Sequence, residues 1–283
     1  SPIKSLFSDQ QYIVDEILNQ INEGTYKVFV VQGDPGSGKT ILANYLLKEL
    51  TDQGKDAALV FSMTSIRKTV QEVFKSVLGM DDKVIGPADL RKKKYEVLIV
   101  DEAHRLNRRK NLANYGIFDQ VNQYFNLDSD GDQLDWISKS ADITILFYDS
   151  FQSIKPSDIE PEKLKKFIEE SNALVLNLEE QIRIEGGNEY LEIINNILYQ
   201  QNSPNLSLNN YEFKIFDDIN DMQELIKDRN NIHGLSRLLA GYDWDWQSKD
   251  GSKDYDIEIN GLQLKWNSKT EGWMSSKDSV NEV

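Results

Sequence analysis

The chain has 283 residues, of which 39% are hydrophobic and 28% are charged. This composition is globular and excludes collagen-like, mucin-like and mainly disordered classes. Because the sequence contains no Cys and two His, it excludes a disulfide framework and a thiolate metal site and argues against a His-based one. No apolar run approaches the ~18 residues that span a bilayer, and no signal peptide is visible. We therefore expect no membrane partner and a reducing, cytoplasmic location.

The net charge of −15 argues against non-specific binding of nucleic acid over the whole surface. The charge is unevenly distributed, because residues 62–110 contain twelve basic and seven acidic side chains. This window indicates a local basic face on an acidic body. For any single run of charges, such as Arg91–Lys94, an ordinary solvated surface is at least as good an interpretation as a binding face.

Short apolar runs alternate with longer amphipathic segments up to Leu178. Apolar side chains at helical spacing predict helices, and short β-branched runs predict buried strands. The predicted helices cover 10–22, 41–50 and 64–78, and the predicted strands cover 27–32, 57–63, 97–100, 143–148 and 173–178. This alternation predicts an α/β fold, with a parallel sheet that carries helices on both faces.

The pattern is looser after Leu178, and the tail from Asp243 holds four of the five Trp residues. We predict helices over 189–199 and 218–229, a loop over 201–210, and strands over 212–216 and 237–241. The change in pattern predicts a boundary between a first domain, residues 1–180, and a second, residues 181–283.

Residues 33–40, GDPGSGKT, match the phosphate-loop pattern G-x-x-x-x-G-K-[ST] between a predicted strand and a predicted helix. Glycines let successive backbone N–H groups turn toward phosphate oxygens, and the following helix adds its positive N-terminal end. We expect Lys39 to reach the β- and γ-phosphates of ATP and the Thr40 hydroxyl to ligate Mg²⁺. The candidate nucleotide-binding residues here are Gly33, Asp34, Pro35, Gly36, Ser37, Gly38, Lys39 and Thr40.

A second acidic motif, Asp-Glu-Ala-His, follows the apolar strand predicted at 97–100. The strand delivers Asp101 to the carboxyl edge of the sheet, where we expect it to hold the hydration shell of Mg²⁺. Glu102 is placed to polarise the attacking water as a general base, which indicates hydrolysis. His104 is interpreted either as a link from this site to a neighbouring segment or as a helix-surface His.

Three further residues are candidates because of where they fall. Gln11, or its neighbour Gln10, could pair with adenine through its amide, although Ser8 and Gln11 are equally interpreted as a capping box. Gln152 follows a predicted strand, where a parallel-sheet ATPase senses the γ-phosphate; a simple turn is the alternative. Arg183 begins the second region and could neutralise charge on the transferred phosphate; otherwise it is a surface ion pair.

Together these segments resemble a superfamily 1 helicase core, with D-x-x-Q at 149–152 and Q-x-R at 181–183. Tyr148 stands where that motif usually has Gly. More narrowly, the phrases LFYDSFQSI, LEEQIRI and SRLLAGYDWDW resemble the Schlafen group 3-like DNA/RNA helicase domain family over about residues 6–275. Trp244 and Trp246 alternate as on a strand, and core packing is favoured for them over stacking on a base.

The resemblance implies two RecA-like lobes with ATP between them and a nucleic-acid track across both. The implied fold is a RecA-like P-loop NTPase lobe, a parallel sheet flanked by helices, followed by a partial second α/β lobe. Such cores end with a motif resembling H-T-x-Q-G, followed by another functional arginine of the second lobe, and no segment before Val283 matches either feature. We therefore expect a chain cut inside the second lobe, with further domains before Ser1 and after Val283.

The sequence predicts an ATP- and Mg²⁺-dependent helicase-like ATPase that acts on DNA or RNA, with a single strand as the expected partner. Its catalytic candidates are Lys39, Glu102, Gln152 and Arg183. Two alternatives stay open: a P-loop ATPase of the signalling or protein-remodelling type, which the acidic charge favours, and a module that uses nucleotide as a switch without turnover.

Overall fold

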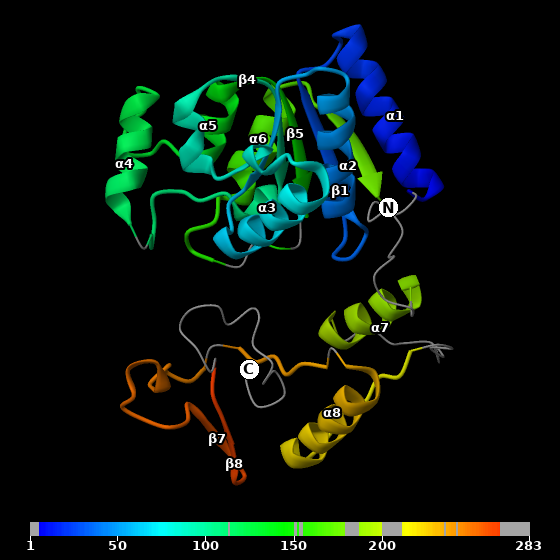
Figure 1. Cartoon of the computed structure of the whole chain (residues 1–283), viewed down its shortest axis with the longest axis vertical. Coiled ribbons are helices and arrows are strands. Elements are labelled where there is room, and N and C mark those ends of the chain that lie inside the picture. Colours follow the sequence, from blue (N-terminus) through cyan, green and yellow to red (C-terminus); the bar gives the residue numbers. More distant parts are fainter. Residues whose placement is uncertain are drawn as a thin grey trace. The chain divides into compact units, whose positions relative to one another are not determined.

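A computed structural model describes residues 6–112, 114–149, 152, 155–178, 187–199, 211–234, 236–241 and 243–266. The chain forms two compact units, Ser1–Tyr211 and Glu212–Val283 (Figure 1). The nucleotide motifs all lie in the first unit.

The first unit is built on a six-stranded sheet in the order β3-β2-β4-β5-β1-β6, with every pair parallel. Its strands are β1 (Val28–Gly33), β2 (Ala57–Phe61), β3 (Val84–Ile85), β4 (Tyr95–Asp101), β5 (Ala141–Tyr148) and β6 (Leu174–Leu178). Its helices are α1 (Ser8–Glu23), α2 (Lys39–Asp52), α3 (Thr64–Leu78), α4 (Tyr115–Tyr124), α5 (Gln133–Ser140), α6 (Pro161–Glu170) and α7 (Gly187–Tyr199). Short 3₁₀ turns cover Asp81–Lys83, Pro87–Lys92 and Ala103–Arg105. The predicted α/β fold is confirmed.

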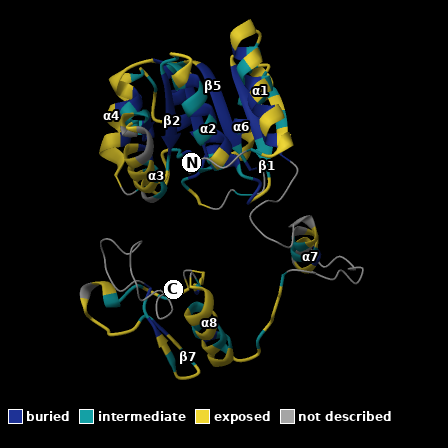
Figure 2. Ribbon diagram, turned by 45° about the vertical axis from the view of Figure 1, so that its right-hand side comes forward, coloured by how far each residue is buried: buried dark blue, intermediate teal, exposed yellow. Residues whose placement is uncertain are grey.

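Alternate strand residues point to opposite faces of the sheet, and each face has its own apolar core. Phe29 and Val31 of β1 pack with α1, α2 and α3, whereas Val28 and Val30 pack with α4, α5 and α6. The buried sheet therefore lies between two helical layers, as its colouring in Figure 2 shows. Burial on both faces explains why these strands are continuous apolar runs in the sequence.

The sheet order places the ends of the motif strands side by side. β5 lies between β1 and β4, with Gln32 of β1 opposite Tyr148 and Val100 of β4 opposite Leu146. The carboxyl ends of parallel strands meet at one edge of the sheet, so the segments after β1, β4 and β5 converge there.

The second unit contains α8 (Ile219–His233), a 3₁₀ turn (Ser248–Asp250) and an antiparallel hairpin of β7 (Ile257–Ile259) and β8 (Leu262–Leu264). Its small core buries Leu238, Ile257, Leu264 and Trp266, with Trp244 and Trp246 packed against them. The Nε1 group of Trp266 donates to the carbonyl of Trp244 over 2.9 Å. Core packing of Trp244 and Trp246 is confirmed.

Two strand predictions in the second unit are wrong. Residues 212–216 alternate polar and apolar side chains, yet they form no strand, and Ile215 is 82% exposed. Residues 237–241 form none either. Alternation predicts a strand only where a neighbouring strand supplies the hydrogen bonds, and no described segment pairs with either of these.

Candidate nucleotide site

The phosphate loop connects β1 to α2 through a backbone that requires glycine. Gly36 and Gly38 have φ values of 90° and 92°, in the left-handed region that other residues rarely adopt. Gly33 lies so close to the β6 end that an added Cβ would stand 2.9 Å from Cβ of Leu178. A side chain at any of these three positions would therefore displace the loop.

Lys39 is the first residue of α2 and is buried, with 6% of its side chain exposed. Its Nζ donates to the carbonyls of Gly33 at 2.5 Å and Asp34 at 3.0 Å. The same nitrogen lies 3.7 Å from Oδ2 of Asp149, a carboxylate at the end of β5. These two carbonyl oxygens and the Asp149 carboxylate thus hold the Lys39 ammonium group next to the phosphate loop.

Thr40 and Asp101 form the link between the phosphate loop and the acidic motif. The Thr40 hydroxyl donates to Oδ2 of Asp101 over 2.7 Å. Asp101 is 1% exposed, and this burial raises the pKa of its carboxyl to about 6. A divalent cation here would favour the ionised carboxylate, and a hydroxyl with a carboxylate is an oxygen donor set of the kind that Mg²⁺ takes. The two residues therefore fit a magnesium ion that is otherwise held by phosphates and water.

The described residues contain no group of three or more His, Cys, Asp or Glu side chains that could hold a metal by themselves.

Glu102 and His104 lie directly after Asp101. Glu102 has a φ of 55°, an uncommon left-handed conformation for a side chain of this size. Its Oε2 lies 2.9 Å from Nε2 of His104, and this imidazole holds the pKa of the Glu102 carboxyl below its usual value. His104 is 2% exposed, so the interpretation as a helix-surface His is wrong.

The end of β5 completes the carboxyl edge between β1 and β4. The backbone N–H of Asp149 donates to Nδ1 of His104 over 3.3 Å, and the Gln152 N–H donates to the Asp149 carbonyl over 3.4 Å. Gln152 is therefore tied by its backbone N–H to Asp149, directly after β5. Asp149 opens the D-x-x-Q motif, but no role is predicted for it from sequence; its place directly after an apolar strand is the signal that could identify it as a site residue.

The structure brings Gln10, rather than Gln11, into contact with the phosphate loop. Gln10 is buried, and its amide nitrogen donates to the Ser37 carbonyl over 3.2 Å. The exposed Gln11 instead donates to Asp15 on the next turn over 2.8 Å. The capping box of Ser8 and Gln11 is not formed, because Phe7 is the N-cap and its N–H donates to the side chain of Gln10.

Arg183 lies outside the described residues, so its place relative to the phosphate loop stays a prediction. Lys39, Thr40, Asp101 and Glu102 all lie at the carboxyl edge of the sheet, and Lys39 contacts the loop through the carbonyls of Gly33 and Asp34.

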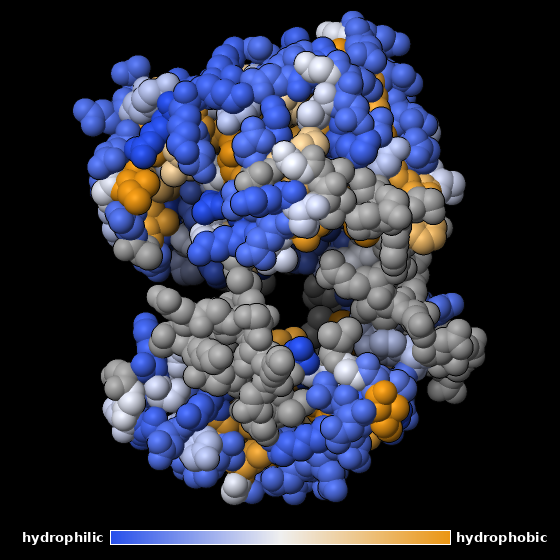
Figure 3. Space-filling view, viewed as in Figure 1, coloured by the Kyte–Doolittle hydropathy of each residue, from blue (hydrophilic) through white to orange (hydrophobic). Residues whose placement is uncertain are grey.

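Many basic side chains of residues 62–110 are engaged by acids. Lys83 and Lys93 pair with Asp56, Lys92 with Asp89, Lys94 with Asp142, Arg105 with Asp158, Arg108 with Glu160, and Arg109 with Asp119. The run Arg91–Lys94 therefore fits the ordinary charged surface better than a binding face. Polar residues cover most of the view of this unit in Figure 3.

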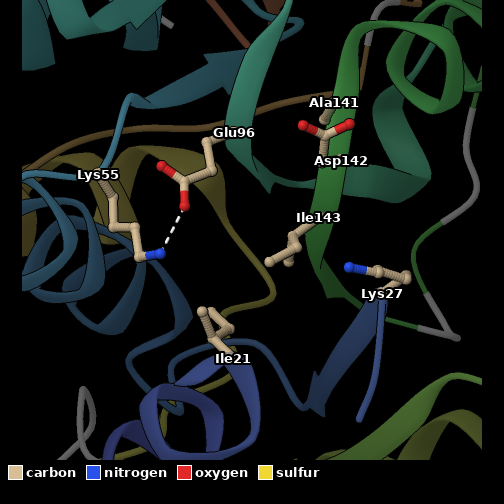
Figure 4. Close-up of a pocket in the computed structure, with 7 residues that line it drawn as sticks. All are labelled: Ile21, Lys27, Lys55, Glu96, Ala141, Asp142 and Ile143. Carbon is tan, nitrogen blue, oxygen red and sulfur yellow. Dashed lines mark hydrogen bonds and ion pairs between the residues drawn. The ribbon is translucent and has the colours of Figure 1, made fainter. Parts of the chain in front are cut away.

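A separate pocket of about 510 Å³ lies at the amino ends of the strands, on the far side of the sheet from the phosphate loop (Figure 4). Lys27, Lys55 and Glu96 line it, together with the first residues of β5, and Lys55 pairs with Glu96. These residues stand at the amino ends of the strands, whereas the phosphate loop follows a carboxyl end. The pocket therefore belongs to no part of the candidate nucleotide site.

None of the described helices is both long and apolar enough to cross a membrane.

Comparison with known proteins gives matches over most of the chain. An uncharacterised protein of Saccharomyces cerevisiae is 24% identical over 335 residues, which cover 99% of this chain and 71% of that protein. The structure of Bacteroides Pif1 bound to ssDNA has 14% identity and a TM-score of 0.37, and it covers 86% of this chain. The Pif1 helicase of Candida albicans has 13% identity and a TM-score of 0.38, and it covers 80% of this chain.

This chain spans 58% of that Bacteroides chain and 54% of that Candida chain. The sequence profile described as Schlafen group 3, DNA/RNA helicase domain matches residues 26–283. The chain therefore belongs to the Schlafen group 3 DNA/RNA helicase domain family.

Proposed function

We propose that this chain binds and hydrolyses ATP at the phosphate loop and that DNA or RNA, as a single strand, stimulates the hydrolysis. One observation carries the proposal: the side chains of Lys39, Thr40 and Asp101 converge at the carboxyl edge of a parallel sheet, beside Glu102. Membership of a helicase-domain family supports nucleic acid as the partner.

Each residue has a distinct task in this proposal. Lys39 leaves the carbonyls of Gly33 and Asp34 to bind the β- and γ-phosphates, which accept the same N–H groups. Thr40 and Asp101 hold Mg²⁺, which when bound neutralises phosphate charge. Glu102 orients the attacking water and accepts its proton as the water bonds to the γ-phosphorus, the bond to the β,γ-bridging oxygen breaks, and ADP leaves. Gln152 and Arg183 are proposed to contact the γ-phosphate from the β5 turn and from the second region.

The proposed domain division is the one predicted from sequence, with the ATPase lobe over 1–180 and a second lobe over 181–283. The change in hydrophobic pattern after Leu178 supports that division.

Steady-state ATP turnover, with and without single-stranded DNA and RNA, tests the proposal. We expect Glu102→Gln to bind ATP as the wild type does and to hydrolyse it about 10²–10⁴-fold more slowly, because the general base is lost. Asp142→Asn, on the exposed start of β5, is the control and should leave turnover unchanged. Full activity in Glu102→Gln would contradict the assigned base.

A protein-remodelling ATPase is the second candidate, favoured by the net charge of −15 and by the ion pairs that engage the basic window. Turnover that no DNA or RNA stimulates would support it over the helicase-like activity. ATP binding without any turnover would instead support a nucleotide switch.

A further inference from the structure

Three contacts form a continuous chain between the phosphate-loop lysine and the acidic motif. Lys39 Nζ lies 3.7 Å from Asp149 Oδ2, the Asp149 N–H donates to His104 Nδ1 over 3.3 Å, and His104 Nε2 lies 2.9 Å from Glu102 Oε2. The imidazole is the member that joins two different segments of the edge, the one after β4 and the one after β5.

The hydrogen bond from Asp149 decides which imidazole nitrogen carries the proton. Because Nδ1 accepts the backbone N–H, a neutral His104 carries its proton on Nε2. That nitrogen lies 2.9 Å from Oε2 of Glu102, without the alignment of a full hydrogen bond. A carboxylate has two oxygens, so a contact at Oε2 fixes the orientation of the group and leaves its other oxygen for a water molecule.

Other features of the site hold this arrangement in place. His104 is buried, and its ring lies 6.3 Å from the ring of Tyr148, the residue that stands where the helicase motif usually has Gly. Glu102 is held at a φ of 55°, a conformation that persists where surrounding contacts compensate its cost. The described contacts of His104 thus immobilise a side chain whose neighbour is the proposed base.

We propose that His104 is a positioning residue, which fixes the Glu102 carboxylate and links its orientation to the segment that follows β5. The inference rests on the proposed ATP hydrolysis. When the phosphates of ATP draw Lys39 away from Asp149, a shift of Asp149 is transmitted through His104 to Glu102.

Two substitutions separate the two contacts of His104. Asn places its amide near the position of Nδ1, so His104→Asn keeps an acceptor for the Asp149 N–H and loses the contact with Glu102. Gln places its amide near the position of Nε2, so His104→Gln keeps a donor toward Glu102. We expect His104→Asn to lower kcat by about tenfold or more with little change in KM, because the base is misplaced. His104→Gln should lower kcat by less than His104→Asn does.

His233→Asn, on the exposed end of α8, is the matched control, and its kcat and KM should equal those of the wild type.

A double variant tests whether His104 acts through Glu102. Once Glu102→Gln has removed the base, adding His104→Asn should cause no further loss of turnover. ATP affinity, measured directly by calorimetry, should stay within about threefold of wild type in each single variant, because neither side chain is proposed to bind ATP.

A readout that does not need activity is the imidazole NMR spectrum, since the chain contains two His. His233→Asn assigns the remaining signals to His104, which should carry its proton on Nε2, and Glu102→Gln should shift those signals. This measurement keeps the inference testable even if a His104 variant fails to fold.

The outcomes are distinguishable. A wild type that neither binds nor hydrolyses ATP would overturn the proposed function and this inference with it. An active wild type would overturn the inference alone if His104→Asn kept the wild-type kcat. Independent, multiplicative losses in the double variant, or a His104 proton on Nδ1, would do the same.

Discussion

At the scale of single residues, the site combines a buried ammonium group with a buried carboxyl. Motif spacing could predict Lys39, Thr40, Asp101 and Glu102, because backbone connectivity fixes them at the ends of two strands. It could not choose between Gln10 and Gln11. Neighbouring helix residues differ by about 100° in direction, and only the packing of α1 decides which one faces the loop.

The raised pKa of Asp101 makes a prediction about stability and pH. Its carboxyl titrates near 6 in the folded chain and near 3.8 when unfolded, so folding favours the protonated form. Below the unfolded pKa, the carboxyl is protonated in both states and its burial does not lower the free energy of unfolding. As the pH rises, burial of the ionised carboxylate lowers that free energy, by about 3 kcal/mol once the pH is well above 6. Without Mg²⁺, we therefore expect Asp101→Asn to exceed the wild type in stability at pH 8 and to lose most of that advantage at pH 4.

Urea unfolding at the two pH values measures this difference. Asn19→Ala, an exposed change on α1 that removes no titratable group, is the control and should show no such pH dependence. An advantage of Asp101→Asn that is the same at both pH values would show that this carboxyl does not titrate as described.

At the scale of elements, β1, β2, β4 and β5 could be predicted because parallel strands buried on both faces are apolar, β-branched runs. β6 could be predicted from its apolar residues as well, although it is an edge strand in which Val175 is 40% exposed. The helices α4, α5 and α6 were not predicted, since the segments around them are polar and irregular and tertiary contacts stabilise them. The hairpin of β7 and β8 was also missed. Its signal was present as Asn260-Gly261, two residues with φ values of 48° and 83° that suit a tight turn.

The helix α5, which sequence did not predict, is stabilised by its N-cap residue, Asp132. Asp132 is buried, accepts from the N–H groups of Leu134 and Asp135, and pairs with Lys163 of α6. Because Asp132→Ala removes the cap and leaves those groups without a partner, we expect it to lower the free energy of unfolding by about 1–3 kcal/mol.

Chemical denaturation measures this cost, with Asn114→Ala as the matched control. Asn114 caps α4 through the N–H of Ile117 at an exposed position, where water can replace the lost bond. A smaller loss is expected there, and an equal loss in the two variants would contradict the special role of the buried cap.

At the scale of the whole molecule, the nucleotide motifs lie in one compact unit, while the family-specific phrase SRLLAGYDWDW and the Trp-containing segment 264–267, LKWN, lie in the other. In the second unit, Trp244, Trp246 and Trp266 form a small core, which gives those phrases a structural role. The alternation of Trp244 and Trp246 favoured core packing from sequence alone, but only the structure shows the residues against which they pack.

The central claim is that the phosphate loop binds ATP through Lys39, and calorimetric titration with ATP and Mg²⁺ tests it most directly. We expect wild-type protein to bind and Lys39→Ala to bind at least about 10–100-fold more weakly, because a charge-assisted hydrogen bond is lost. Lys48→Ala, on the same helix but paired with Asp52, should bind as the wild type does. Wild-type affinity in Lys39→Ala would contradict the account.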